Sequence, residues 1–223
     1  MKKPLIITIE RQYGSGGRTV GEMLANELGI HYYDKELSRL CSEVSGINED
    51  LFIDADESIK KNKLFKPARK EGGAYKGELF GPKDPDFISM ENLFNFQAKV
   101  LKDLAKSESC VIIGRCANHV LKDYDNVTSV FVHAPMDFLI EQAEKKQSRR
   151  GEELVKYINT TNRNRADYYE YYTGHRWSRA LNYDLCLDCS KLGFETCVEE
   201  IKAYLKVRYG NDVFDNLSGA HTA

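Results

Sequence analysis

The sequence predicts an α/β protein with a parallel β-sheet whose strands are connected by helices. Short apolar runs alternate along the chain with segments of helical periodicity, which is the pattern of such a fold. The first run, at residues 5–10, leads through a glycine-rich turn into an amphipathic helix, and this order of elements builds a cradle for phosphate. With 223 residues, 42% of them apolar, the chain is long enough to bury a core.

The individual elements follow from the two periodicities. Short apolar runs predict strands over residues 5–10, 31–34, 110–114, 129–133 and 184–188. Helical spacing of apolar residues predicts helices near residues 17–28, 35–45, 89–107, 115–122, 136–149, 151–172 and 191–208. We predict a single domain over residues 1–223, with a frayed polar tail at 210–223.

Residues 46–88 interrupt this rhythm. The segment contains Gly72-Gly73, Gly77, Gly81-Pro82 and Pro85 together with many lysines, and no strong strand pattern. We therefore expect an insert or a mobile segment on the substrate side of the domain, and no separate domain.

Charge and hydropathy exclude several classes of function. The net charge of −2 gives no bulk attraction to nucleic acid or to an acidic membrane, so an anion site must come from local arginines and lysines. The sequence has no run of 18 apolar residues, so no transmembrane helix is expected. The N-terminal apolar run ends at Glu10, and a run of this length is too short for a signal peptide. We therefore expect a cytoplasmic protein.

The six cysteines are expected to be reduced thiols, because nothing indicates export. Cys186 and Cys189 form a CxxC pair, whose spacing also suits zinc or redox chemistry. The pair lies in a predicted buried strand, and neither a second CxxC nor a histidine pair follows it. Buried thiols are therefore the favoured interpretation, and metal binding stays open.

The glycine-rich turn allows two registers against the pattern G-x-x-x-x-G-K-[ST]. In one, Gly17-Arg18-Thr19 matches G-K-T, and Gln12 stands where the first glycine belongs. In the other, the turn matches the G-S-G-K-G-T loop of small nucleotide kinases, so that Gly17 occupies the lysine position. The second register needs no gap and keeps the apolar face of the next helix in phase, and it is preferred.

Either register leaves the turn with the groups that bind a polyphosphate. The backbone N–H groups of Gly14, Ser15, Gly16 and Gly17 can face an anion, and Arg18 supplies one cation. The hydroxyl of Thr19 suits Mg²⁺. The alternative is a tight glycine turn that joins a strand to a helix and binds nothing.

Two further polar residues follow predicted strands at the carboxyl edge of the sheet, where parallel sheets bind ligands. Asp34 ends the run His31-Tyr32-Tyr33, and it would orient a substrate, lie near Mg²⁺ or cap the next helix. Arg115 follows Val111-Ile112-Ile113-Gly114, and its guanidinium suits a phosphate or a carboxylate. A surface ion pair is the alternative for Arg115.

A basic and aromatic region lies between residues 149 and 179. It contains Arg149, Arg150, Arg163, Arg165, His175, Arg176 and Arg179. Arg163 and Arg165 are two residues apart, so they point to nearly opposite sides of a helix. The two arginines are therefore not expected to contact the same phosphate. Arg149 or Arg150 would converge on Arg165 if two helices pack through a turn near Gly151; a solvated charged face is the alternative.

The tyrosines of this region and His119, earlier in the chain, are not expected to bind a ligand. The four tyrosines of this region suggest packing in a core or interface more than stacking on nucleic acid: Tyr168, Tyr169, Tyr171 and Tyr172. His119 is likewise expected to pack or to lie at the surface.

With these residues assembled, the chain resembles the cytidylate kinase-like family of P-loop nucleoside monophosphate kinases. The matching segments are ERQYGSGGRTVGEMLA at 10–25, YYDKEL at 32–37, IIGRCANHVL at 112–121, RNRADYYEYYTGHRW at 163–177 and NYDLCLDCSKLG at 182–193. The resemblance covers most of the chain, but residues 46–88 contribute little. Well-studied cytidylate kinases carry lysine where this chain has Gly17.

The resemblance implies a three-layer α/β/α fold with a five-stranded parallel sheet, a helical insert at 46–88 on the acceptor side and a lid at 147–165. It implies that ATP binds at Gly14–Thr19 with Mg²⁺ on Thr19. Asp34 and Arg115 would bind a nucleoside monophosphate, with Arg165, Arg149 and Arg150 from the lid. Arg18, Arg115 and Arg165 are the expected catalytic residues.

The expected activity is phosphoryl transfer from ATP to CMP or dCMP. Because the lysine is missing, two alternatives stay open: a nucleotide-binding regulatory protein without turnover, and a kinase of another small acceptor. The expected partners are small molecules, without nucleic acid or membrane, and a homodimer is left open.

Overall fold

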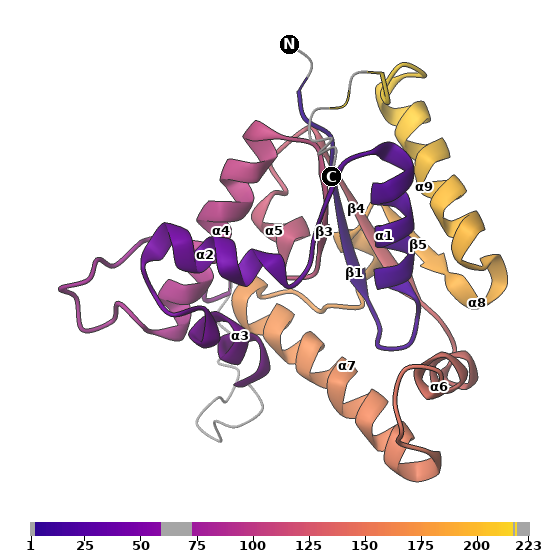
Figure 1. Ribbon diagram of the computed structural model, residues 1–223, viewed down its shortest axis with the longest axis horizontal. Helices are drawn as coiled ribbons and strands as arrows, with labels where there is room; N and C mark the ends of the chain where they lie inside the picture. The colour runs from indigo at the N-terminus through magenta and orange to yellow at the C-terminus, as the bar shows by residue number, and fades with distance from the viewer. Residues whose placement is uncertain (1–2, 59–72, 216, 218–223) are drawn as a thin grey trace.

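The computed structural model describes residues 3–58, 73–215 and 217, and it has a five-stranded sheet as its centre (Figure 1). The strands are β1 (Ile6–Arg11), β2 (His31–Tyr33), β3 (Cys110–Ile113), β4 (Val127–His133) and β5 (Leu185–Asp188). They lie in the order β2-β3-β1-β4-β5, and every neighbouring pair is parallel. The predicted five-stranded parallel sheet is therefore confirmed.

The central strand β1 is nearly continuous in apolar residues because both of its faces are covered. It pairs with β3 from Ile6 opposite Cys110, and with β4 from Ile6 opposite Val127. From β1 the chain continues to β2 at one edge of the sheet, and from β3 it continues to β4 on the opposite side of β1. The direction of the connections therefore reverses between the neighbouring strands β1 and β3. Ligands bind at such a point, outside the carboxyl ends of the strands.

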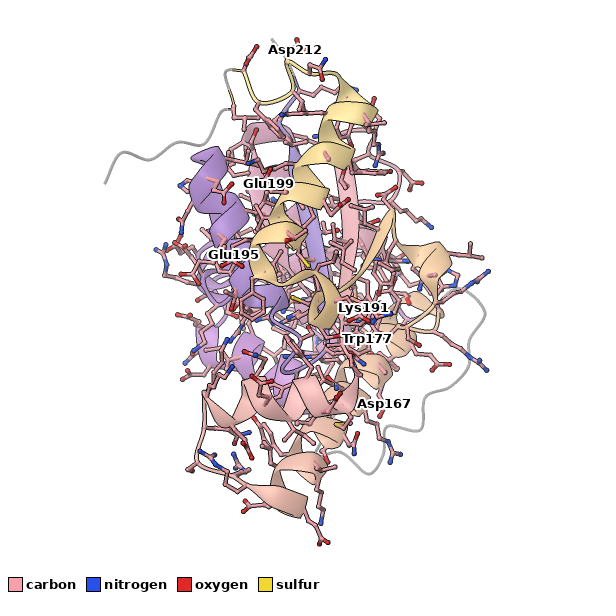
Figure 2. The ribbon with its side chains drawn as sticks, turned by 90° about the vertical axis from the view of Figure 1, so that its right-hand side faces the viewer. Asp167, Trp177, Lys191, Glu195, Glu199 and Asp212 are labelled. Atoms are coloured by element: carbon pink, nitrogen blue, oxygen red, sulfur yellow. The ribbon has the colours of Figure 1, made fainter. Side chains whose placement is uncertain are left out.

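Helices cover both faces of the sheet. They are α1 (Gly17–Leu28), α2 (Glu36–Ser45), α3 (Glu49–Ser58), α4 (Met90–Ser107), α5 (Ala117–Val120), α6 (Met136–Glu144), α7 (Gly151–Thr173), α8 (Cys189–Leu192) and α9 (Phe194–Tyr209), with a short 3₁₀ turn at Ala180–Asn182. Helices α1 and α9 lie on one face, as Figure 2 shows for α9, and α2, α4 and α5 lie on the other. None of the described helices is long and apolar enough to cross a membrane.

The alternation of side chains along each strand divides the core into two layers. On the α4 side, Ile6 and Ile112 pack with Leu101 and Phe94. On the α1 side, Ile7 and Ile9 pack with residues from α1 and α9, among them Leu24, Val198 and Ile201. Burying both layers fixes the strand register, because a slip of one residue would exchange the two faces.

Helix α7 joins this core to a separate arm of the molecule (Figure 1). Its C-terminal end belongs to the α4-side core, where the ring of Tyr172 stacks on Phe94 with 3.8 Å between centroids. Its N-terminal half packs on α6 in a small third core that contains Leu139, Leu154 and Ile158. The arm formed by α6 and the start of α7 contains the segment 147–165 predicted as a lid.

Several predicted helix boundaries are wrong, and positive φ angles explain two of them. The helix expected at 136–149 ends at Glu144. The helix expected at 191–208 is two helices, because Gly193 between α8 and α9 has φ +76°. The helix expected at 115–122 shortens to α5, since Arg115 and Cys116 also have positive φ.

The structure also adds detail to the predicted insert and corrects the predicted burial of the CxxC pair. Helix α3 forms inside the segment 46–88. Residues 59–72 of that segment lie outside the described residues, as do residues 216 and 218–223 of the predicted tail. Strand β5 is at the edge of the sheet, so Cys186 is exposed, contrary to the predicted buried strand, and only Cys189 is buried.

Candidate functional site

A cavity of about 600 Å³ lies at the carboxyl edge of the sheet, beside the glycine-rich turn. Its lining comes from β1, α1, α2, α3, β3, α7 and the segments that follow β1, β2 and β3. The lining residues are Glu10, Arg11, Tyr13, Arg18, Asp34, Lys35, Ser38, Glu49, Ile53, Ile113, Arg115, Cys116, Tyr157, Thr161, Asn164, Arg165, Tyr168 and Tyr169. Among these described residues, five basic side chains face three acidic ones, so the lining has a net positive charge.

The glycine-rich turn before α1 needs its glycines for two physical reasons. Gly14 and Gly16 both have φ +86°, which side chains with a Cβ rarely adopt. A Cβ on Gly14 would also collide with the backbone carbonyl of Leu139 in α6. One of the proposed phosphate donors is already used inside the turn, since the N–H of Ser15 donates to the carbonyl of Gln12 at 3.3 Å.

Gly17 is required by a neighbour on β1. A Cβ added to Gly17 would lie 2.5 Å from the Cβ of Arg11, at the end of β1. The side chain of Arg11 therefore passes over the position where a lysine would begin in the preferred register. Sequence analysis missed Arg11; the signal was an arginine in the last position of the strand, directly before the turn.

The Arg11 side chain continues into the cavity. A Cβ on Gly114 would collide with its Nη1 atom, which places the guanidinium beside the end of β3. Its Nε atom is buried and has no hydrogen-bond partner among the described residues. Burial lowers the pKa of Arg11, and the nearby carboxylates of Glu10 and Asp34 oppose that shift.

Arg18 and Asp34 form an ion pair across the mouth of the cavity. Arg18 Nη2 lies 2.6 Å from Asp34 Oδ2, and the side chains of Arg18 and Asp34 are 48% and 14% exposed. The pair joins the first turn of α1 to the residue after β2. Two residues predicted from separate motifs are therefore in direct contact.

Arg115 reaches the same cavity from β3. Gly114 and Arg115 have φ +71° and +61°, so the chain turns sharply after the strand and directs Arg115 inward. Its Nη2 donates to Ser38 Oγ at 3.4 Å. Burial lowers the pKa of Arg115, and an anion bound beside it would oppose that shift by favouring the charged guanidinium.

Arg165 approaches from α7, and its neighbour Arg163 lies on another side of the helix. Arg165 Nη1 donates to the backbone carbonyl of Arg11 at 2.8 Å. Burial lowers the pKa of Arg165 to about 9, and the positive charge of Arg11 acts in the same direction. The Arg163 side chain is 82% exposed, and its Nε lies 3.8 Å from Asp167.

Arg149 and Arg150 are both described, and neither lines the cavity. Arg149 lies over the ring of Tyr157, with its guanidinium carbon 4.4 Å from the centroid, and forms an ion pair with Glu153. Arg150 donates to the backbone carbonyls of Gln147 and Arg149 at 2.6 and 2.7 Å. The structure thus brings Arg18, Asp34, Arg115 and Arg165 together and leaves these two arginines on the outer arm.

The remaining predicted residue, Thr19, contacts a lysine that the sequence did not single out. Lys146, which follows α6, donates to Thr19 Oγ1 at 3.4 Å. Glu10 was missed as well: it is 5% exposed, and its Oε2 accepts a hydrogen bond from Trp177 Nε1 at 3.0 Å. Both contacts bring together residues more than 120 positions apart, which local patterns do not predict.

A magnesium ion would fit Thr19 through one protein ligand. The described residues contain no group of three or more His, Cys, Asp or Glu side chains able to hold a metal ion. Mg²⁺ commonly takes few protein ligands and completes its shell with water and substrate phosphates. The Thr19 hydroxyl accepts a hydrogen bond from Lys146 Nζ, and a bound Mg²⁺ would have to replace that contact.

The fold is shared with solved structures of other proteins, a kinase among them. A shikimate kinase from Bacteroides thetaiotaomicron is similar with a TM-score of 0.51 at 15% identity, over 91% of this chain and 98% of that chain. An uncharacterized protein from Eubacterium ventriosum is more similar, with a TM-score of 0.66 at 22% identity and the same coverage of both chains.

The sequence comparison then identifies the family. The chain belongs to the Cytidylate kinase-like family, whose sequence model matches residues 6–191. A cytidylate kinase from Thermosipho melanesiensis is 27% identical over 165 residues, which cover 68% of this chain and 70% of that protein.

Proposed function

We propose that this protein transfers a phosphoryl group from ATP to a nucleoside monophosphate, with CMP or dCMP as the acceptor. The observation that carries the proposal is the cavity beside the glycine-rich turn, where Arg18, Asp34, Arg115 and Arg165 meet. Phosphoryl transfer needs positioning and neutralisation of charge more than covalent chemistry. A positively charged cavity joined to a phosphate-binding turn supplies both.

The turn is assigned to ATP. The backbone N–H groups between Gly14 and Thr19 would bind the phosphates of ATP, and the N-terminus of α1 would add a favourable dipole. Because Ser15 N–H already donates to Gln12, the amides of Gly16 and the following residues carry more of this role. Thr19 would hold Mg²⁺, which would supply positive charge to neutralise the phosphates of ATP.

The other side of the cavity is assigned to the acceptor. Arg115 would bind the acceptor phosphate through paired N–H groups. Arg18 and Arg165 would neutralise the charge of the phosphoryl group in transit, and Asp34 would orient Arg18 and the acceptor. Arg149 and Arg150 would contribute only if the arm formed by α6 and α7 closes over the cavity, which would also exclude water and suppress hydrolysis of ATP.

The choice of CMP or dCMP rests on the family and on the relative that is a cytidylate kinase. The same fold serves shikimate and other acceptors, so the sheet and turn alone do not select a base. A small-molecule nucleotide kinase of this kind would act in the cytoplasm.

A coupled assay that follows ADP formation tests the proposal. The purified protein is supplied with ATP, Mg²⁺ and, separately, CMP, dCMP, UMP, AMP, GMP and a set of non-nucleotide alcohols. We expect ADP to form with CMP or dCMP well above the rate without acceptor.

Two results would contradict the proposal and would separate its alternatives. Measurable ATP binding without transfer to any acceptor would indicate a nucleotide-binding protein without turnover. Transfer to a non-nucleotide alone would indicate a kinase of another small acceptor.

A further inference from the structure

The P-loop pattern contains a glycine six positions before its lysine. With Gly17 in the lysine position, the position six residues earlier is Arg11. This chain therefore has a basic residue where the pattern has glycine, and glycine where the pattern has the basic residue. Compared with the pattern, the basic residue and the glycine have exchanged positions.

The structure shows that these two positions touch. The Cβ that Gly17 lacks would lie 2.5 Å from the Cβ of Arg11, which is closer than two such atoms can approach. Arg11 and a side chain at position 17 therefore exclude each other. The exchange is a single structural feature, in which one cationic side chain reaches the turn from β1 and not from α1.

The Arg11 side chain ends in the cavity beside the glycine-rich turn. It lines the cavity together with Arg18, Arg115 and Arg165, next to the end of β3. Its Nε is buried without a hydrogen-bond partner among the described residues. Its own backbone carbonyl accepts the hydrogen bond from Arg165, so the strand end and α7 are held together at this residue.

A buried donor without a hydrogen-bond partner destabilises the folded protein, and a charged donor does so more than a neutral one. A phosphate group placed in the cavity would supply the acceptor that Nε lacks and the negative charge that the guanidinium needs. Arg18 differs, because its guanidinium already forms an ion pair with Asp34.

We propose that Arg11 is a catalytic residue that supplies the cation which lysine supplies in other P-loops, and that position 17 is glycine to leave room for it. The inference rests on the proposed phosphoryl transfer. In that transfer the bond between the bridging oxygen and the γ-phosphorus of ATP breaks, and an oxygen of the acceptor phosphate bonds to that phosphorus. Arg11 donates hydrogen bonds to the phosphoryl oxygens and transfers no proton.

Reversal of the exchange tests the proposal. The variants are Arg11→Gly, Gly17→Lys and the double variant, assayed for kcat with ATP and the best acceptor. Loss of one preorganised donor to the transition state typically costs about 100-fold or more, so Arg11→Gly should lose at least ~100-fold in kcat. Gly17→Lys should also fail, because the new side chain collides with Arg11, and the double variant should exceed Arg11→Gly by at least about tenfold.

Chemical rescue separates a catalytic cation from a structural one. Guanidinium chloride at a concentration that does not unfold the protein should raise kcat of Arg11→Gly by about tenfold and leave the wild type unchanged. Arg163→Gly is the matched control, because this arginine is 82% exposed and outside the cavity, and guanidinium should not affect it. If Arg11→Gly does not fold, Arg11→Lys and Arg11→Gln replace it, and only the lysine variant should keep activity.

The outcomes separate this inference from the proposed function. A wild-type protein without turnover would contradict the proposed function itself. An active wild type whose Arg11→Gly variant stays within threefold of it would overturn only the assignment of Arg11. A folded but slow Arg11→Gly variant that neither guanidinium nor Gly17→Lys improves would overturn it as well.

Discussion

The arginines of the proposed anion site differ in their surroundings. Burial lowers the pKa of Arg11, Arg115 and Arg165, because desolvation disfavours each charged guanidinium. Arg18 is paired with Asp34 and is half exposed. A bound phosphate would compensate the buried cations, whereas a neutral ligand would not.

The first prediction concerns Arg18. Arg18→Ala removes a cation from the turn and leaves Asp34 without its partner, so kcat should fall at least about tenfold. Steady-state kinetics with ATP and CMP measure the effect, and Arg163→Ala on the exposed side of α7 serves as the control. An unchanged kcat for Arg18→Ala would show that Arg18 has no part in the transfer.

His119 gives a prediction on pH. Burial lowers its pKa from 6.5 to about 4, and the charges of Lys122 and His175 act in the same direction, while Asp123 opposes them. Because the unfolded chain binds the proton more tightly, the folded state should lose stability as pH falls from about 6.5 to about 4. Urea unfolding across this range measures the slope, and His119→Gln should flatten it; an equal slope in both proteins would contradict the assignment.

Among the elements, α6 and α7 are tied to the glycine-rich turn at several points. The N–H of Tyr13 donates to Asn162 Oδ1 at 2.7 Å, and Arg165 donates to the carbonyl of Arg11. Gly14 lies against the backbone of α6 at Leu139. A movement of the arm formed by these two helices would therefore act directly on the turn.

The third prediction compares two glycines with positive φ. Gly14→Ala introduces both a strained φ and a collision with the carbonyl of Leu139, whereas Gly29→Ala introduces strain alone, because nothing lies within 4 Å of its Cβ position. We expect Gly29→Ala to cost about 1–2 kcal/mol of unfolding free energy and Gly14→Ala at least ~1 kcal/mol more. Urea unfolding of both variants measures the difference, and equal losses would show that α6 does not press on the turn.

The sequence predicted the strands and most helices correctly, but it did not predict several helix boundaries. The strands followed from apolar runs, but the division of the last helix depended on one positive φ at Gly193, and α3 arose in a segment with weak periodicity. A residue type indicates only an average preference for φ and for burial. Helix boundaries that depend on the φ angle of one particular residue therefore cannot be predicted from it.

On the scale of the whole molecule, the parallel sheet gathers residues that are far apart in sequence. Arg18, Asp34 and Arg115 could be predicted to meet, because each follows the carboxyl end of a strand. Arg11 could not, because its role depends on contact with Gly17 across the turn, and a sequence pattern shows only that lysine is missing. Arg149 and Arg150 were expected near Arg165 if two helices packed through a turn near Gly151. Side-chain contacts on the outer arm place them elsewhere.

The central claim is that this protein moves the γ-phosphoryl group of ATP to a nucleoside monophosphate without the usual lysine. The most direct measurement supplies ATP labelled at the γ-phosphate, Mg²⁺ and CMP, and separates the products. The account predicts label in CDP, at a rate that Arg11→Gly lowers at least ~100-fold. Label found only in inorganic phosphate, or left in ATP after binding has been demonstrated, would contradict it.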